Sequence, residues 1–188
     1  MLPLKEKKSN MQVILIGGKA RSGKDTLADY LYEEFEKMGR KPCKIQVGQY
    51  IKYYAIKYFG WDGKEETKPR DLLIKIGTEI IREKIDSNFH INRLIEDIKV
   101  LSYFYDTFIV SDVRLPIEIE KPKEEFSNVV SIKLERPYTE TTKEQQKHIT
   151  ETGLDNYHNF DYVIKNDKSL EELKEQAMEL AKKIGGSK

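Results

Sequence analysis

A chain of 188 residues, of which 38% are hydrophobic, is long enough to bury the core of one domain. Its 33 Lys and Arg residues nearly balance 32 Asp and Glu residues, and a net charge of +1 argues against a partner such as nucleic acid or an acidic membrane. No apolar run approaches the roughly 18 residues of a membrane span, and the single cysteine, Cys43, cannot form an internal disulfide. We therefore expect a cytoplasmic protein without nucleic-acid or membrane partners, with residues 1–10 as a mobile leader.

The first predicted strand, Val13–Ile16, leads into a glycine-rich turn, and a helical pattern begins near Lys24. Gly18 is followed by four residues and then by Gly23-Lys24, which is the spacing of a phosphate-binding loop. In such a loop the backbone N–H groups point inward, the helix N-terminus adds partial positive charge, and the lysine supplies a mobile cation. The residues expected to form this polyphosphate cradle are Gly18, Lys19, Ala20, Arg21, Ser22, Gly23, Lys24, Asp25 and Thr26.

One position departs from the usual loop. Ser or Thr normally follows the lysine and holds Mg²⁺ with its hydroxyl, whereas this chain has Asp25 there and Thr26 one residue later. A carboxylate is a hard oxygen ligand, so Asp25 is a candidate to bind the metal directly or through water. The alternative is that Asp25 only adds a favourable charge to the first helical turn.

The rest of the chain alternates between helical and strand patterns. Gly39 is placed to end the first helix. The expected strands are Lys44–Gly48, Thr107–Asp112, Asn128–Leu134 and Phe160–Ile164. The expected helices are Gln49–Phe59, Pro69–Ile81, Ile91–Leu101, Leu115–Phe126 and a last one from the N-cap Ser169 through Ile184. Trp61–Lys68 is expected to be an exposed loop, and the tyrosines of Gln49–Phe59 are interpreted as core and helix packing rather than as a base-stacking cluster.

This order predicts a three-layer α/β fold with a five-stranded parallel sheet. Residues 11–188 would form a single P-loop domain, with a helical insertion over about 49–104 and a polar lid over about 138–158. Ligands of open parallel sheets lie beyond the carboxyl ends of the strands, where Asp112 and Arg114 would emerge beside the phosphate loop. A small domain with an insertion and a lid favours phosphoryl transfer to a second substrate, which needs positive charge on the migrating group. The candidate arginines are Arg21, Arg70, Arg82, Arg93, Arg114 and Arg136.

Several segments together resemble the phage-type deoxynucleoside monophosphate kinases and, in part, animal-type phosphomevalonate kinase. The phosphate loop with Asp25 in the hydroxyl position is similar to that of both groups. The further matches to the phage-type kinases are Lys68–Leu73 with Gly77-Thr78-Glu79, Asp86–Asn92, Ser111–Glu118 and His148–Thr152. Ile117 stands where the strand-end motif usually has Asn, and Thr150 replaces Ser in the lid signature. The segments 153–157 and 160–164 are similar to both groups.

The resemblance implies an ATP- and Mg²⁺-dependent kinase that phosphorylates a small phosphorylated acceptor to a diphosphate. It implies that Lys24 and Asp25 handle ATP and Mg²⁺, and that Asp112 lies near the metal or the acceptor. It implies that Arg114 grips an acceptor phosphate and that Arg136 belongs to the closing region. The acceptor contacts that it implies are Arg70, Glu79, Arg114, His148 and Glu151.

The leading hypothesis is thus a nucleoside or deoxynucleoside monophosphate kinase. A phosphomevalonate-type kinase is the second hypothesis, suggested by Gly153–Asn156. A third is a regulatory module that binds the nucleotide without transferring phosphate, which the Asp25 and Ile117 departures leave open. The base, the sugar and the oligomeric state do not follow from the sequence.

Overall fold

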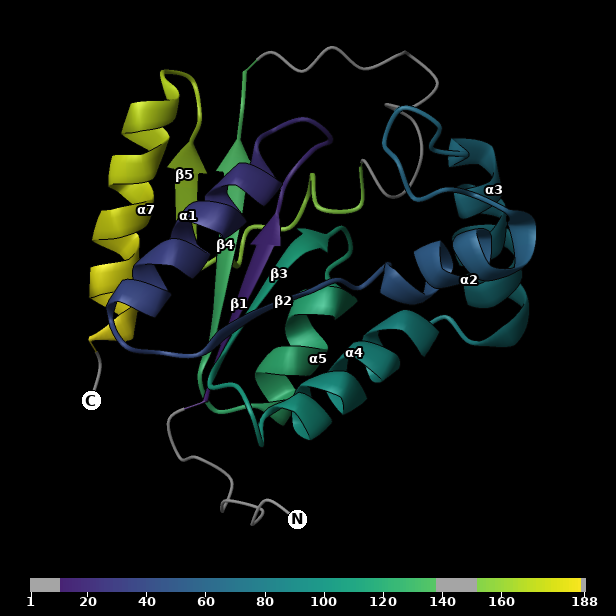
Figure 1. Ribbon diagram of the computed structural model, residues 1–188, viewed down its shortest axis with the longest axis horizontal. Helices are drawn as coiled ribbons and strands as arrows, with labels where there is room; N and C mark the ends of the chain where they lie inside the picture. The colour runs from purple at the N-terminus through teal and green to yellow at the C-terminus, as the bar shows by residue number, and fades with distance from the viewer. Residues whose placement is uncertain (1–10, 138–151, 187–188) are drawn as a thin grey trace.

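The computed structural model describes residues 11–137 and 152–186, and its sheet is five-stranded and parallel with the order β2-β3-β1-β4-β5 (Figure 1). The predicted leader 1–10 and most of the predicted lid lie outside the described residues. The strands are β1 (Gln12–Gly17), β2 (Pro42–Ile45), β3 (Thr107–Val113), β4 (Val129–Glu135) and β5 (Tyr162–Lys165). The predicted five-stranded parallel sheet is confirmed.

Helices cover both faces of the sheet, which makes three layers (Figure 1). Along β1 the side chains alternate, so that Val13 and Leu15 join the core on one face while Ile14 and Ile16 join the core on the other. All four side chains are fully buried, as expected for a central strand of a parallel sheet. The helices are α1 (Lys24–Lys37) and α7 (Leu170–Gly185) on one face, and α4 (Phe89–Leu101) and α5 (Ile117–Glu125) on the other.

Local signals in the sequence explain where the two helices of the first face start and stop. Gly39, with φ +75°, follows the end of α1 as predicted, because glycine adopts a left-handed conformation without strain. The Ser169 hydroxyl accepts a hydrogen bond from the Glu172 backbone N–H at 3.2 Å and so caps α7. None of the described helices is long and apolar enough to cross a membrane.

The segment between β2 and β3 consists of helices, α2 (Gln49–Phe59), α3 (Arg70–Ile74), the π-helix η1 (Lys75–Ile85) and α4. The sequence predicted one α-helix where α3 and η1 follow each other. The wider winding of η1 is marked at its end, where the Asp86 N–H donates to the carbonyl oxygen of Ile81 at 2.9 Å. Gly77 lets η1 approach α2, since a Cβ at this position would lie 2.5 Å from Cδ1 of Ile51.

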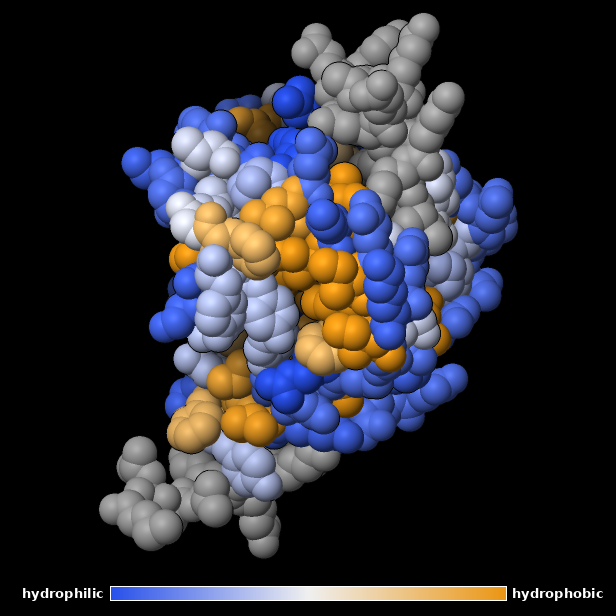
Figure 2. Space-filling model, turned by 90° about the vertical axis from the view of Figure 1, so that its right-hand side faces the viewer, coloured by the Kyte–Doolittle hydropathy of each residue, from blue (hydrophilic) through white to orange (hydrophobic). Residues whose placement is uncertain are grey.

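Two sequence-based predictions about this helical segment are wrong in part. Trp61 is buried rather than exposed, with its indole N–H donating to the Lys64 carbonyl at 3.1 Å. Tyr53 and Tyr58 of α2 stay outside the core, because they are half or more exposed and pack against each other, whereas half-buried Tyr50 packs on α4 and donates to Asp97 at 2.9 Å. Ile80 and Ile85 on η1 are also exposed. Figure 2 shows apolar side chains gathered on the face of the molecule that lies at the right in Figure 1.

Candidate active site

The phosphate loop requires glycine at two positions, each with a positive φ and a close neighbour. Gly18 has φ +148°, and a Cβ there would lie 2.5 Å from the backbone carbonyl oxygen of Leu134 in β4. Gly23 has φ +97° and would place a Cβ 2.5 Å from Nδ2 of Asn166. Arg21 adopts a positive φ of 59° without being glycine, which is a strained conformation typical of functional loops. The loop therefore lies tightly against the ends of β4 and β5.

Lys24 begins α1 and points back into the loop. Its Nζ donates to the Lys19 carbonyl oxygen at 2.6 Å, and only 7% of the residue is exposed. The buried Ser22 hydroxyl finds no hydrogen-bond partner among the described residues, which is costly unless a ligand supplies one. Asn166 supports the loop from behind, because its Nδ2 donates to the Ser22 carbonyl at 2.8 Å. The loop thus holds a buried cation and an orphaned hydroxyl, both suited to a phosphate.

Two carboxylates lie at the end of β3 beside the loop. Asp25 Oδ1 accepts a hydrogen bond from the Ser111 hydroxyl at 2.6 Å. Asp112 accepts from the backbone N–H groups of Val47 at 2.8 Å and Gly48 at 3.0 Å. Hard oxygen ligands of this kind, together with phosphate oxygens and water, are what Mg²⁺ prefers. The residues present therefore fit a magnesium ion between this edge of the sheet and a bound polyphosphate.

The contacts of Asp112 also explain why β2 is shorter than predicted. The chain leaves the sheet after Ile45, so the N–H groups of Val47 and Gly48 turn to the Asp112 carboxylate instead of extending the strand. Burial raises the pKa of Asp112, although these two N–H groups, Lys52 and Arg114 each lower it. Asp112 consequently anchors the connection between β2 and α2 to the end of β3.

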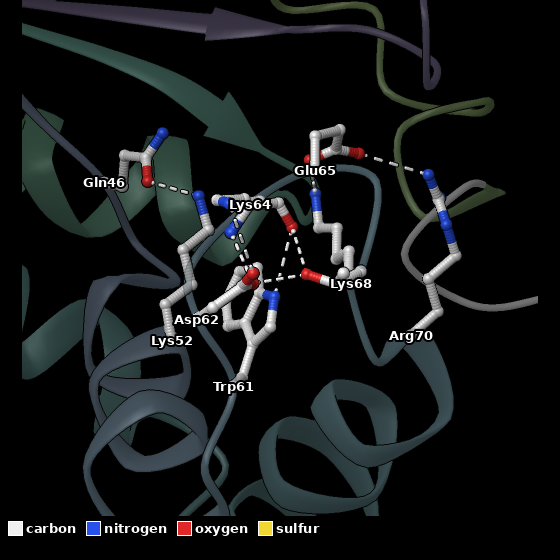
Figure 3. A network of polar contacts seen from close by, with 9 residues as sticks. Gln46, Lys52, Trp61, Asp62, Lys64, Glu65, Lys68 and Arg70 are labelled. Carbon is white, nitrogen blue, oxygen red and sulfur yellow. Dashed lines mark hydrogen bonds and ion pairs between the residues drawn. The ribbon is translucent and has the colours of Figure 1, made fainter.

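A pocket of about 760 Å³ extends from the phosphate loop toward the helical segment. One of its walls is strongly cationic, with Lys52, Lys68, Arg70, Arg82 and Arg114 among the residues that line it. Acidic side chains partly neutralise this wall. Figure 3 shows the Glu65 carboxylate between two of these cations, at 2.8 Å from Lys68 Nζ and 3.2 Å from Arg70 Nη2. Since Glu65 is 65% exposed, this contact is worth little and can open when an anion enters.

A second ion pair in the pocket is of a different kind. Arg82 Nη2 lies 2.7 Å from Oε1 of Glu118, whose side chain is 1% exposed. Burial raises the pKa of Glu118, and the charge of Arg82 with its hydrogen bond lowers it. Removal of one partner of such a buried pair strongly destabilises the fold, because the other charge is left buried and uncompensated.

Further cavities open beside this pocket, and two of them could hold parts of a ligand. One of about 390 Å³ lies on the other side of the phosphate loop and is lined by Gly18, Arg136, Lys165 and Asp167 among others. The other, of about 180 Å³, is mostly apolar. Its lining residues are Gly48, Ile51, Lys52, Leu73, Ile74, Gly77, Thr78 and Arg82, so it shares Arg82 and Lys52 with the cationic wall.

The structure brings together many, but not all, of the residues that the sequence singled out. Arg21, Lys24, Asp25, Arg70, Arg82, Asp112 and Arg114 line the same pocket, together with Ala20. Arg136 lines the cavity on the other side of the loop. Half-buried Thr26 lines neither this cavity nor the pocket in the described part of the chain.

Other predicted residues are not brought to the pocket. Glu79 is exposed on η1 and does not line it. Arg93 points away, toward Tyr50 at 3.1 Å and Glu96 at 2.7 Å. His148 and Glu151 lie outside the described residues.

Sequence reasoning missed several residues of this pocket and also Asn166, which supports the phosphate loop from behind. Glu118 entered the sequence analysis only as the last residue of the segment Ser111–Glu118, because an acid on a helix is usually exposed and gives no sign of burial. Gln46, Lys52 and Asn166 carry no signal either. Lys52 Nζ donates to Gln46 Oε1 at 2.6 Å, a contact between α2 and the preceding loop that only the packing of these elements creates (Figure 3).

The comparisons with known proteins agree with this geometry. The family model described as "Deoxynucleotide monophosphate kinase" matches residues 36–177. The match begins after the phosphate loop. The assignment of the loop therefore rests on its spacing and geometry and is independent of the family match. No curated protein sequence matches the chain.

Solved structures of kinases share the fold. The APS kinase of Mycobacterium tuberculosis, in complex with AMPPNP and APS, has a TM-score of 0.56 at 12% identity, with 95% of this chain and 99% of that chain covered. A sugar kinase from Janibacter sp. has a TM-score of 0.55 at 16% identity, with 94% and 95% covered. A gluconokinase from Sinorhizobium meliloti has a TM-score of 0.54 at 11% identity, with 94% of each chain covered. At these identities the likeness shows the P-loop kinase fold alone.

Proposed function

Because the chain belongs to the deoxynucleotide monophosphate kinase family, we propose that it transfers the terminal phosphoryl group of ATP to a nucleoside or deoxynucleoside monophosphate, with the diphosphate as product. One observation carries this proposal. The phosphate loop and a wall of arginines and lysines open into one pocket of about 760 Å³, so that a donor and an acceptor phosphate can meet there. Phosphoryl transfer depends mainly on such alignment and on positive charge around the migrating group.

On the donor side, the loop residues 18–26 are proposed to bind the phosphates of ATP. Lys24 would leave the Lys19 carbonyl and contact the outer phosphates, and the buried Ser22 hydroxyl would gain its missing partner. Asp25 and Asp112 would hold Mg²⁺, which supplies further positive charge to the polyphosphate when bound. Ser111 would keep the Asp25 carboxylate in place through its 2.6 Å hydrogen bond.

On the acceptor side, Arg70, Arg82 and Arg114 are proposed to bind the phosphate of the monophosphate. Arginine presents a planar fork of donors that matches phosphate oxygens, and several arginines around one phosphate also stabilise the charge of the transition state. Glu65 would release Lys68 and Arg70 as the acceptor enters, because a dianionic phosphate attracts them more strongly than one exposed carboxylate does.

The apolar recess next to this wall favours an acceptor that carries a base. Ile51, Leu73 and Ile74 offer apolar walls of the kind that line small-molecule sites, and Thr78 adds one polar group. The cavity of about 390 Å³ on the other side of the loop, which includes Arg136, is the proposed place for the nucleoside part of ATP. The two nucleosides would then lie on opposite sides of the transferred phosphoryl group.

A coupled assay of ADP release tests the proposal. The purified protein with ATP and Mg²⁺ is offered each ribo- and deoxynucleoside monophosphate and also phosphomevalonate. We expect turnover with at least one nucleoside monophosphate and none with phosphomevalonate. Turnover with phosphomevalonate alone, or ATP binding without transfer to any monophosphate, would contradict the proposed function.

Matched arginine variants test the placement of the acceptor. Arg70→Ala removes a side chain that lines the pocket, while Arg93→Ala removes one that points to Tyr50 and Glu96 instead. We expect Arg70→Ala to raise the KM of the acceptor about tenfold, as for the loss of one charge-assisted hydrogen bond, and Arg93→Ala to change it less than twofold. Equal effects of the two variants would show that the acceptor lies elsewhere.

A further inference from the structure

Glu118 contacts two arginines of the cationic wall, and the proposed reaction assigns it no role. One carboxylate oxygen, Oε1, accepts from Arg82 Nη2 at 2.7 Å. The other oxygen, Oε2, accepts from the backbone N–H groups of Arg114 at 2.7 Å and Leu115 at 3.1 Å. One buried carboxylate therefore holds the side chain of one arginine and the main chain of another.

These contacts join the helical segment to the end of β3. Arg82 belongs to η1 in the helical segment, whereas Arg114 directly follows β3 in the sheet. Glu118, in the first turn of α5, lies between them and lines the pocket itself. Its carboxylate thus holds the Arg82 guanidinium next to the main chain of Arg114, whose own guanidinium donates to the Gly18 carbonyl oxygen at 3.4 Å.

We propose that Glu118 is a positioning residue that orients Arg82 and Arg114 toward the phosphate of the acceptor. This inference rests on the proposed function and adds to it a residue that does not touch the substrate itself. Arg82 has five N–H donors and uses Nη2 on Glu118, which leaves others of its donors for a phosphate in the pocket. The backbone contacts of Glu118 set the direction in which the Arg114 side chain leaves the end of β3.

The two acidic residues on the cationic wall would then play opposite roles. Glu65 is 65% exposed and holds Lys68 and Arg70 by contacts that solvent weakens. Glu118 is 1% exposed and is fastened by two backbone N–H groups, so it stays in place when a phosphate arrives. A fixed counter-charge also keeps the guanidinium of Arg82 in one orientation before the substrate binds. Less conformational entropy of this side chain is then lost on binding.

Steady-state kinetics of Glu118→Gln, with Glu120→Gln as the matched control, test the proposal. Gln keeps the size of the side chain but loses its charge, and Glu120 is an exposed acid on the same helix. We expect the KM of the acceptor to rise about tenfold in Glu118→Gln while the KM of ATP changes less than twofold, and we expect the control to match the wild type. A loss of kcat with an unchanged acceptor KM, or equal changes in both KM values, would mean that Glu118 only supports the fold and would overturn the proposal.

A double-mutant cycle shows whether Glu118 acts through Arg82. In the background of Arg82→Ala, the change Glu118→Gln is expected to alter the acceptor KM less than threefold, because Arg82 is gone and only the effect through Arg114 remains; a full tenfold change there would overturn this link. Should Glu118→Gln not fold, Arg82→Lys serves instead, since lysine keeps the charge opposite Glu118 but lacks the fork of donors. An unchanged acceptor KM in Arg82→Lys would also overturn the proposal.

A binding experiment separates this proposal from the proposed function. The chain has one tryptophan, Trp61, whose indole N–H contacts Lys64 in the loop that carries Glu65 and Lys68 into the pocket. Titration with inorganic phosphate, followed by Trp61 fluorescence, reports on the anion site without any turnover. We expect an affinity about tenfold weaker in Glu118→Gln than in Glu120→Gln. This difference together with an inactive wild type would refute the proposed function alone, whereas no difference would refute the role of Glu118 alone.

Discussion

Replacement of Gly18 by alanine tests the geometry of the phosphate loop most directly. The residue has φ +148°, which costs an alanine on the order of 1–3 kcal/mol. Its new Cβ would also lie 2.5 Å from the Leu134 carbonyl oxygen and 3.1 Å from the Ser22 hydroxyl. The closer of these atoms belongs to the backbone of β4 next to the centre of the sheet, so it cannot move aside as a side chain would. With about 1–3 kcal/mol more for this overpacking, we expect Gly18→Ala to lower the free energy of unfolding by about 3 kcal/mol.

Gly39→Ala is the matched control. Gly39 also has a positive φ, +75°, but nothing lies within 4 Å of the Cβ that alanine would add. Urea unfolding of both variants should show a loss of about 1 kcal/mol for Gly39→Ala, and the difference between the variants measures the contact with β4 alone. The ATP affinity should fall at least tenfold in Gly18→Ala and stay unchanged in Gly39→Ala. Equal stability losses, or full ATP affinity in Gly18→Ala, would refute the close approach of the loop to Leu134.

Three other substitutions test single contacts. Lys24→Met keeps the buried aliphatic stem and removes the cation, so we expect kcat in the ADP-release assay to fall about 10²- to 10³-fold. The circular-dichroism spectrum should match that of the wild type, and an undiminished kcat would refute the role of Lys24. Ser111→Ala frees the Asp25 carboxylate, so the Mg²⁺ concentration for half-maximal activity should rise about threefold or more, and an identical Mg²⁺ titration would speak against Asp25 as a metal ligand. Asp106→Asn should lower the free energy of unfolding by about 2 kcal/mol at pH 7, because hydrogen bonds and Arg40 lower the pKa of Asp106 although burial alone raises it. Since the folded pKa is below the unfolded value of about 3.9, the ionised Asp106 stabilises the fold above that pH and this contribution is lost as the pH falls through the folded pKa. Urea unfolding at pH 7 and pH 3 should therefore show a smaller difference between Asp106→Asn and the wild type at the lower pH, and a constant difference would contradict this account.

The parts of the fold that the sequence predicts are those that local patterns determine. The spacing of Gly18, Gly23 and Lys24 identified the loop, and the run of apolar residues before it identified the central strand, because both depend only on neighbours along the chain. Capping by Ser169 is of the same kind. Asp112 and Arg114 were placed beside the loop by the rule that parallel strands end at one edge of the sheet.

What the sequence could not determine depends on contacts between distant segments. The end of β2 at Ile45 follows from two N–H groups that turn to Asp112, a residue of another strand. The α2 tyrosines have a helical pattern typical of a core, yet Tyr53 and Tyr58 are exposed, and half-buried Tyr50 instead donates its hydroxyl to Asp97 of α4. Periodicity shows which residues share a face but not what the face meets.

The same distinction holds for the site. By itself the sequence determined the phosphate loop, the class of fold and a set of candidate arginines for binding the acceptor. Only the tertiary structure decided that Arg82 reaches the pocket while Arg93 points away, and that Glu118 joins Arg82 to the turn after β3. The physical reason is that a charged side chain on a helix has many possible partners in sequence, and only the packing of that helix against others determines which partner lies within hydrogen-bond distance.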